Sequence, residues 1–272
     1  MNKDIDKLQE LRKKVFITGY KGGMAHLASC FSCLEILYVL YNRKVLNIKK
    51  DNPKWENRDR FILSKGHAGL ALYSVLENNE LIDNKYLDSY LVNEHLIGGE
   101  PCTTDCEWIE ASTGSLGHGL SMGLGMAIGL KDTASKVYVL LGDGECQEGS
   151  VWEAAMMAAA QNCNNLIAIL DCNRIQKMDF TNRILGNENW KEKWESFGWL
   201  VKEVDGHSVD KLESMLKEKN DTNKPLLIIA NTIKGKGVSI MENNPNWHFK
   251  LPNKKELEVF KKELNIQDSE LI

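Results

Sequence analysis

Residues 142–149 read GDGECQEG and directly follow VYVLL at 137–141. The VYVLL run is short and continuously apolar, which is typical of a strand buried on both faces in a parallel sheet. Gly142 and Gly144 allow a tight turn and let the backbone approach an anion such as phosphate. Asp143 lies between them and would repel a phosphate group unless a cation lay between the two charges. The stretch therefore predicts a strand end that holds both a cation and a phosphate.

The next apolar run supplies a matching ligand. LIAIL at 166–170 reads as a second buried strand, and Asn173 follows just past its end. A right-handed strand–helix–strand crossover can place two neighbouring strand ends side by side, so we expect Asp143 and Asn173 to lie a few ångströms apart. An aspartate oxygen, an asparagine oxygen, a backbone carbonyl, phosphate oxygens and water make an octahedral shell for Mg²⁺. The two strand ends together predict a clamp for a metal ion and a diphosphate.

The same pattern continues along the chain. Further strands are predicted at 60–64, 199–204 and 225–231, and helices at 4–19, 30–43, 116–131, 150–162 and 251–264. Alternating strands and helices indicate an α/β fold with a doubly wound, mainly parallel sheet and helices on both faces. The glycine-rich helix should pack very closely. We expect residues 1–272 to form a single diphosphate-binding domain with a polar C-terminal extension at about 242–272, including an exposed terminal helix.

Composition excludes several classes of protein. A net charge of −4 and the lack of a basic stripe argue against nucleic acid as a partner. The charged start of the chain is unlike a secretory signal, and no apolar stretch reaches the roughly 20 residues of a membrane span. Seven cysteines, an odd number, favour reduced thiols and a cytoplasmic location over a disulfide framework.

Two cysteine pairs invite a metal-site hypothesis. Cys30 and Cys33 have helical spacing within an apolar segment, which favours buried core residues. Cys102 and Cys106 follow His95, but the spacing matches no common zinc pattern, so a surface loop is the favoured interpretation.

The clamp resembles the thiamine diphosphate motif, and the chain resembles the amino-terminal, diphosphate-binding part of transketolase over almost its whole length. The stretches that carry the resemblance are NPKWENRDRFILSKGHAGLALY (52–73), STGSLGHGLSMGLGMAIG (112–129), GDGECQEGSVWEAAMMAA (142–159), FGWLVKEVDGH (197–207) and NTIKGKGVSIMENNPNWH (231–248).

The resemblance implies a set of site residues. The implied Mg²⁺ ligands are the side chains of Asp143 and Asn173 and the carbonyl of Ile175. The implied cofactor-binding residues are His67, Gly114, Ser115, Leu116, Gly142, Asp143, Gly144, Glu145, Asn173, Ile175, Lys234 and His248. The implied catalytic residues are His26, His67, His248 and Glu148, with Glu148 pairing across a subunit interface. Histidines suit proton transfer near neutral pH.

Two departures from the family matter for function. The chain lacks the family's pyrimidine-binding domain, so the resemblance implies a separate C-terminal transketolase subunit, an α2β2 complex and little activity for this chain alone. The family's Gly-His-Pro-Gly is Ala25-His26-Leu27-Ala28 here, and Gly98-Gly99-Glu100-Pro101 stands where the family has a second Gly-His-Pro. In the family, that second histidine contacts hydroxyl groups of the ketose donor.

The expected function is the transfer of a two-carbon unit from a ketose or ketose-phosphate donor to an aldose or modified-sugar acceptor, with thiamine diphosphate and Mg²⁺. The missing histidine keeps an alternative open, namely acetyl transfer from pyruvate to a keto-sugar or a nucleotide-linked sugar. Further alternatives are a deoxyxylulose-phosphate-synthase-like reaction, part of a 2-oxo-acid dehydrogenase, or a non-catalytic subunit. A dinucleotide-binding domain is disfavoured because GDGECQ lacks the G-x-G-x-x-G spacing.

Overall fold

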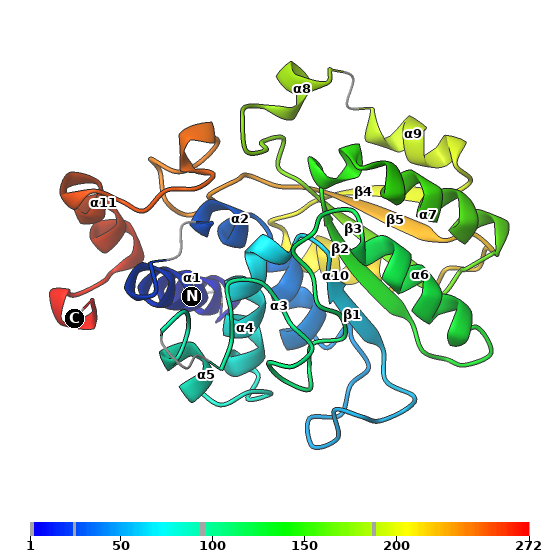
Figure 1. The fold of residues 1–272 in the computed structure, drawn as a ribbon, viewed down its shortest axis with the longest axis horizontal. Helices are drawn as coiled ribbons and strands as arrows, with labels where there is room; N and C mark the ends of the chain where they lie inside the picture. Colours follow the sequence, from blue (N-terminus) through cyan, green and yellow to red (C-terminus); the bar gives the residue numbers. More distant parts are fainter. Residues whose placement is uncertain (1–2, 24–25, 93–95, 187–188, 272) are drawn as a thin grey trace.

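The computed structural model describes residues 3–23, 26–92, 96–186 and 189–271. Within them, one parallel sheet of five strands has the order β1-β2-β3-β5-β4 (Figure 1). The strands are β1 (Arg60–Leu63), β2 (Val137–Gly142), β3 (Leu166–Cys172), β4 (Leu200–Asp205) and β5 (Leu226–Asn231). The α-helices are α1 (Lys3–Lys21), α2 (Leu27–Ser32), α3 (Leu34–Asn42), α4 (Gly69–Asn78), α5 (Lys85–Asp88), α6 (Gly119–Gly129), α7 (Gly149–Ala160), α8 (Thr181–Ile184), α9 (Trp190–Ser196), α10 (Val209–Lys217) and α11 (Lys254–Leu264).

Helices cover both faces of the sheet, as the alternation of strands and helices predicted. Successive side chains of a strand point to opposite faces. Leu140 of β2 packs in the core shared with α1, α3 and α4, whereas Val139 and Leu141 pack in the core shared with α6, α7 and α9 (Figure 1). Leu140 is fully buried, and its replacement by alanine would cost about 2–5 kcal/mol.

The strand register brings the functional loops to one edge. Gly142 of β2 pairs with Asp171 of β3, and Cys172 of β3 pairs with Asn231 of β5. Because all the pairings are parallel, the loops that follow these strands leave the sheet together at its carboxyl edge. This register is what lets residues far apart in the sequence share one cavity.

Helix α6 packs on the sheet as closely as its glycines predicted. A Cβ atom on Gly123 would lie only 2.5 Å from Cγ2 of Val139, so only a hydrogen atom fits there. The helix is shorter than the predicted 116–131. It begins at Gly119 because Gly114 and Gly117, with φ of +137° and +85°, place the preceding residues in a turn.

Two helix predictions were wrong in part. The predicted helix at 30–43 is two helices, α2 and α3, separated at Cys33, whose φ and ψ are −105° and 7°. Next to the break, the hydroxyl oxygen of Ser32 lies 3.1 Å from the carbonyl of Ser29 and 2.5 Å from Oδ2 of Asp171. These contacts tie the end of α2 to the sheet, and α3 restarts in a new direction.

The terminal helix α11 is amphipathic, not exposed all round. Phe260 and Leu264 are fully buried, and the ring of Phe260 stacks on Phe16 of α1 with centroids 4.6 Å apart. The many lysines and glutamates of this segment concealed a short apolar stripe at helical spacing.

The seven cysteines all lie within the described residues, and none forms a disulfide. Cys30 and Cys33 are buried in the core, as expected. His95 lies outside the described residues, so the structure says nothing of a site that includes it. None of the described helices combines the length and the apolar character needed to cross a membrane.

Candidate active site

A cavity of about 350 Å³ opens at the carboxyl edge of the sheet. Its walls come from the loops after β1, β2, β3 and β5, from the start of α2 and from the turn before α6. The lining residues are His26, Lys65, His67, Glu100, Gly114, Leu116, Gly142, Asp143, Gly144, Glu145, Gln147, Glu148, Asn173, Ile175, Gln176, Lys177, Lys234 and His248. Open parallel sheets hold ligands at this edge, so the cavity is the first candidate site.

The loop tips after β2 and β3 are joined through Asp143. Its Oδ1 atom accepts a 2.7 Å hydrogen bond from the backbone N–H of Gly144, and its Oδ2 atom accepts one from the backbone N–H of Arg174. Beside this bond, Oδ1 of Asn173 accepts a 3.1 Å hydrogen bond from the N–H of Ile175. The two strand ends therefore meet, as their spacing predicted.

A buried ion pair lies beneath the clamp. Lys65 and Asp171 are 1% and 0% exposed, and their side chains form a salt bridge. Thr232 also donates its hydroxyl to Asp171, which connects the loop after β5 to the same carboxylate. Burial opposes charge on Asp171, but Lys65 and the surrounding hydroxyls hold the pKa of Asp171 below its usual value. A fixed negative charge thus remains under the site.

Burial, together with the charge of Asp171, raises the pKa of Asp143. A buried carboxylate in this position is short of a positive charge. Lys234 supplies part of one: its ammonium donates to the carbonyl of Ile175 at 2.8 Å and lies 2.8 Å from Nδ1 of His248. Burial and the charge of Lys65 lower the pKa of Lys234 in turn.

Three imidazoles form a triangle in the cavity. The ring centroids of His26 and His67 are 5.4 Å apart, those of His26 and His248 5.7 Å, and those of His67 and His248 6.1 Å. Burial, aided by Lys234, lowers the pKa of His26 to about 4 and that of His248 to about 3. Burial, aided by Lys65, also lowers the pKa of His67 well below its ordinary value. All three rings are neutral at pH 7, so each offers one donor and one acceptor.

Glu145 turns away from the open part of the cavity. Its carboxylate accepts hydrogen bonds from the backbone N–H of Gly117 at 2.9 Å and of Gly142 at 3.0 Å, and from the hydroxyl of Ser64. This carboxylate braces the turn before α6 against the ends of β1 and β2. Glu148, in contrast, is exposed at the start of α7.

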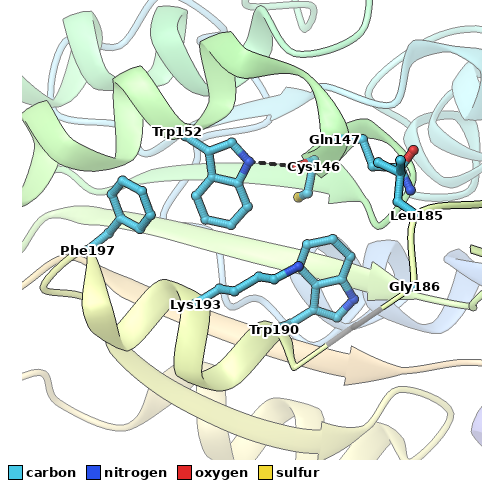
Figure 2. A pocket seen from close by; sticks show the side chains of 8 residues that line it. All are labelled: Cys146, Gln147, Trp152, Leu185, Gly186, Trp190, Lys193 and Phe197. Atoms are coloured by element: carbon cyan, nitrogen blue, oxygen red, sulfur yellow. Dashed lines mark hydrogen bonds between the residues drawn. The ribbon is translucent and has the colours of Figure 1, made fainter. Parts of the chain in front are cut away.

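A second cavity of about 360 Å³ lies between α7 and α9 (Figure 2). Its lining residues are Cys146, Gln147, Trp152, Leu185, Gly186, Trp190, Lys193 and Phe197. Trp152 donates from Nε1 to the carbonyl of Cys146 at 2.9 Å, and burial raises the pKa of the Cys146 thiol. The wall is mainly aromatic and offers no acid–base pair. The cavity at the carboxyl edge is therefore the better candidate for catalysis.

The family model for the thiamine diphosphate binding domain of transketolase matches residues 16–271. The chain belongs to the transketolase family. It is 39% identical over 257 residues to one of the chains named as a subunit of apulose-4-phosphate transketolase in Phocaeicola vulgatus, covering 93% of this chain and 91% of the relative. It is 38% identical to the 6-deoxy-6-sulfo-D-fructose transketolase subunit SqwG of a Clostridium species, covering 82% of each chain.

The fold is also that of a transketolase. Superposition on the crystal structure of Campylobacter jejuni transketolase gives a TM-score of 0.86 at 28% identity over 98% of this chain. The chain spans only 44% of that longer protein. The resemblance, the α/β fold and the transketolase-type two-carbon transfer expected from the sequence are confirmed, and thiamine diphosphate is the cofactor of the matched domain.

Most residues that the transketolase resemblance singled out line the cavity at the carboxyl edge. Ser115 is exposed on the turn between Gly114 and Leu116. The sequence reasoning did not assign a role to other lining residues, namely Lys65, Gln147, Gln176 and Lys177. Lys65 carried a signal, since it precedes Gly66 and His67 at the end of a predicted strand. Glu100 had been noted only for the histidine it replaces.

Proposed function

We propose that this protein is the diphosphate-binding subunit of a two-chain transketolase. It would transfer a two-carbon unit from a ketose or ketose-phosphate donor to an aldose or modified-sugar acceptor. The observation that carries the proposal is the bond from Arg174 N–H to the Asp143 carboxylate, which joins two strand ends in a cavity that also holds three neutral imidazoles.

The donor set suits Mg²⁺ and a diphosphate. Asp143, Asn173 and Ile175 offer a carboxylate, an amide oxygen and a backbone carbonyl to the same cavity, and oxygen ligands are what Mg²⁺ prefers. A divalent ion would balance the buried charge of Asp143. At Gly144 a Cβ atom would lie 2.9 Å from Cβ of Gln176, so glycine keeps the backbone open where the diphosphate would approach.

Thiamine diphosphate, when bound, supplies the electron sink for breaking and making the carbon–carbon bond. The chain's residues would orient the sugar and handle its protons. A neutral imidazole can accept a proton from a donor hydroxyl at one nitrogen and return it to a product oxygen. His26, His67 and His248 are placed for this task, and Lys234 fixes the ring of His248 through Nδ1.

We also propose a partner chain and a symmetric complex. Relatives of similar length are named as subunits of a transketolase, which implies a second chain that would bring the pyrimidine-binding part this one lacks. On the outer face of α6 and α7, Ile128, Met156 and Met157 are 44%, 53% and 49% exposed. Gly125 and Gly129 leave the α6 surface flat. Such an apolar face supports pairing of two copies, with Glu148 near the same face, in an α2β2 assembly.

Assays of each chain alone and of the mixture test this function. The mixture should transfer a two-carbon unit from a ketose phosphate only with thiamine diphosphate and Mg²⁺, and the lone chain should be nearly inactive. Pyruvate should be offered in parallel, because strong acetyl transfer would favour the alternative. Failure of the mixture to use any donor, with both chains folded, would remove the proposal.

A further inference from the structure

Glu100 is held in place at the imidazole side of the cavity. The segment that carries it packs on the start of α4, where a Cβ atom on Gly69 would lie 3.1 Å from the carbonyl oxygen of Gly99 and 3.5 Å from Cα of Glu100. The carbonyl of the next residue, Pro101, accepts a 3.0 Å hydrogen bond from the N–H of Thr113. The backbone on both sides of Glu100 is therefore fixed.

The carboxylate of Glu100 lies directly over Gly114. A Cβ atom on Gly114 would overlap this carboxylate and lie 2.7 Å from its carbon. Gly114 in turn packs on Gly66, where a Cβ atom would lie 2.7 Å from the nitrogen of Gly114. His67 follows Gly66 directly. These contacts form a continuous wall from Glu100 to the triangle of imidazoles.

Glu100 is also the acid in this cavity with its hydrogen-bonding capacity unused. Asp143 and Glu145 accept hydrogen bonds from backbone N–H groups. Within residues 3–23, 26–92, 96–186 and 189–271, Glu100 makes no hydrogen bond or ion pair. An ionised carboxylate only accepts hydrogen bonds, so a ligand beside it must bring donors.

We infer that Glu100 selects the donor substrate: its carboxylate accepts hydrogen bonds from a hydroxylated, uncharged ketone and repels a 2-oxo acid. The inference rests on the proposed transketolase function. A ketose presents hydroxyl groups beside its carbonyl, whereas a 2-oxo acid presents a carboxylate there. The neighbouring imidazoles are neutral, so they offer a 2-oxo acid no full positive charge against this repulsion.

Two donors that deliver the same two-carbon unit isolate this effect. L-Erythrulose is an uncharged ketose, and hydroxypyruvate carries a carboxylate in place of the hydroxylated carbon. The ratio of their kcat/KM values is to be measured on the reconstituted two-chain complex for wild type and for Glu100→Gln. We expect the amide to raise the ratio of hydroxypyruvate to erythrulose by about tenfold, the size of one like-charge contact partly screened by water. Glu100→Asp should keep the wild-type preference.

A matched control is Glu107→Gln, which removes an acid from the same part of the chain. Glu107 pairs with Lys54 at 2.9 Å, and its side chain is 60% exposed, outside the cavity. This variant should leave the donor ratio unchanged. Calorimetric binding of hydroxypyruvate to the complex, loaded with an unreactive cofactor analogue, gives a readout independent of turnover and should tighten in Glu100→Gln.

Two failures are distinguishable. If the wild-type complex uses neither donor, the proposed function is wrong. If it uses erythrulose normally, but Glu100→Gln changes neither the donor ratio nor the binding of hydroxypyruvate, the function stands and the inference about Glu100 is overturned.

Discussion

The Nδ1 atom of His207 lies 3.1 Å from the Oε2 atom of Glu35, a buried carboxylate on α3. The opposite ring nitrogen, Nε2, accepts a 2.8 Å hydrogen bond from the backbone N–H of Ile233. Because Nε2 is an acceptor, the ring proton lies on Nδ1 and faces the carboxylate. Through His207, Glu35 fixes the loop residue that immediately precedes Lys234.

Removing the charge of Glu35 should destabilise the fold. Arg12 forms a buried salt bridge with Glu35, and both side chains are under 10% exposed. We expect Glu35→Gln to lower the free energy of unfolding at pH 7 by about 3–5 kcal/mol, because Arg12 is left buried without its counter-charge. Urea denaturation measures this. Glu10→Gln, which removes an exposed ion pair with Lys7, should cost less than about 1 kcal/mol.

The pH dependence of this difference has a defined sign. Burial would raise the pKa of Glu35, but His207 and Arg12 hold it below the ordinary value of 4.5. A depressed pKa means that the stabilisation is complete above the unfolded value and is lost as pH falls through the folded value. The gap between wild type and Glu35→Gln should therefore narrow below pH 4.5. A gap that widened with acid would contradict the assigned pairing.

Asp143→Asn should separate binding from stability. Loss of the carboxylate should weaken Mg²⁺-dependent retention of thiamine diphosphate by at least about tenfold, because a charged oxygen ligand is replaced by a neutral one. The unfolding free energy of the chain without ligands should not fall, since burial raises the pKa of Asp143 and makes its charge costly. Calorimetry with and without EDTA, alongside urea denaturation, tests both. Asp132→Asn, on an exposed loop, is the control.

His26 should make the ligand-free chain sensitive to mild acid. Burial, with help from Lys234, lowers the pKa of His26 from 6.5 to about 4. Between these values the unfolded chain binds the proton more readily, so the free energy of unfolding should fall as pH falls from 6.5 towards 4. His26→Gln should flatten this part of the curve. Urea denaturation across the range would refute the idea if both curves kept the same slope.

Two glycines of α6 should respond oppositely to alanine. A methyl group on Gly123 would lie 2.5 Å from Cγ2 of Val139, so Gly123→Ala should destabilise by about 1–3 kcal/mol. A methyl group on Gly125 meets no atom within 4 Å, so Gly125→Ala should stabilise by about 0.5–1 kcal/mol through lower chain entropy. Urea denaturation of this chain by itself compares the two. Equal effects of both substitutions would show that α6 does not pack as described.

The apolar face of α6 and α7 should control assembly. Met156→Glu combined with Met157→Glu places charge on half-exposed methionines, and we expect the reconstituted complex to fall to half its mass. Light scattering after size-exclusion chromatography measures the mass. Ile5→Glu, at a 64% exposed site on α1, should leave it unchanged. An intact mass in the double variant would mean that the copies pair through another surface.

Much of the fold could be predicted from local pattern. The apolar runs at β2, β3 and β5 correspond to buried strands because a strand covered on both faces needs apolar residues throughout. The two helix errors arose where packing against distant parts of the chain overrides local pattern. The break at Cys33 depends on contacts of Ser32 with the sheet, and the buried stripe of α11 depends on its neighbour α1.

The sequence by itself determined the strands, the order of strand and helix, and the pairing of Asp143 with a ligand from the next strand end. These features are encoded within short windows, where apolar periodicity and glycine spacing have one main structural solution. Only the tertiary structure decided which distant residues share the cavity. The carboxylate of Glu100 over Gly114, and that of Glu35 beside His207, depend on how separate loops and helices pack. No local propensity specifies such contacts, because they form only once the sheet register has fixed where each loop begins.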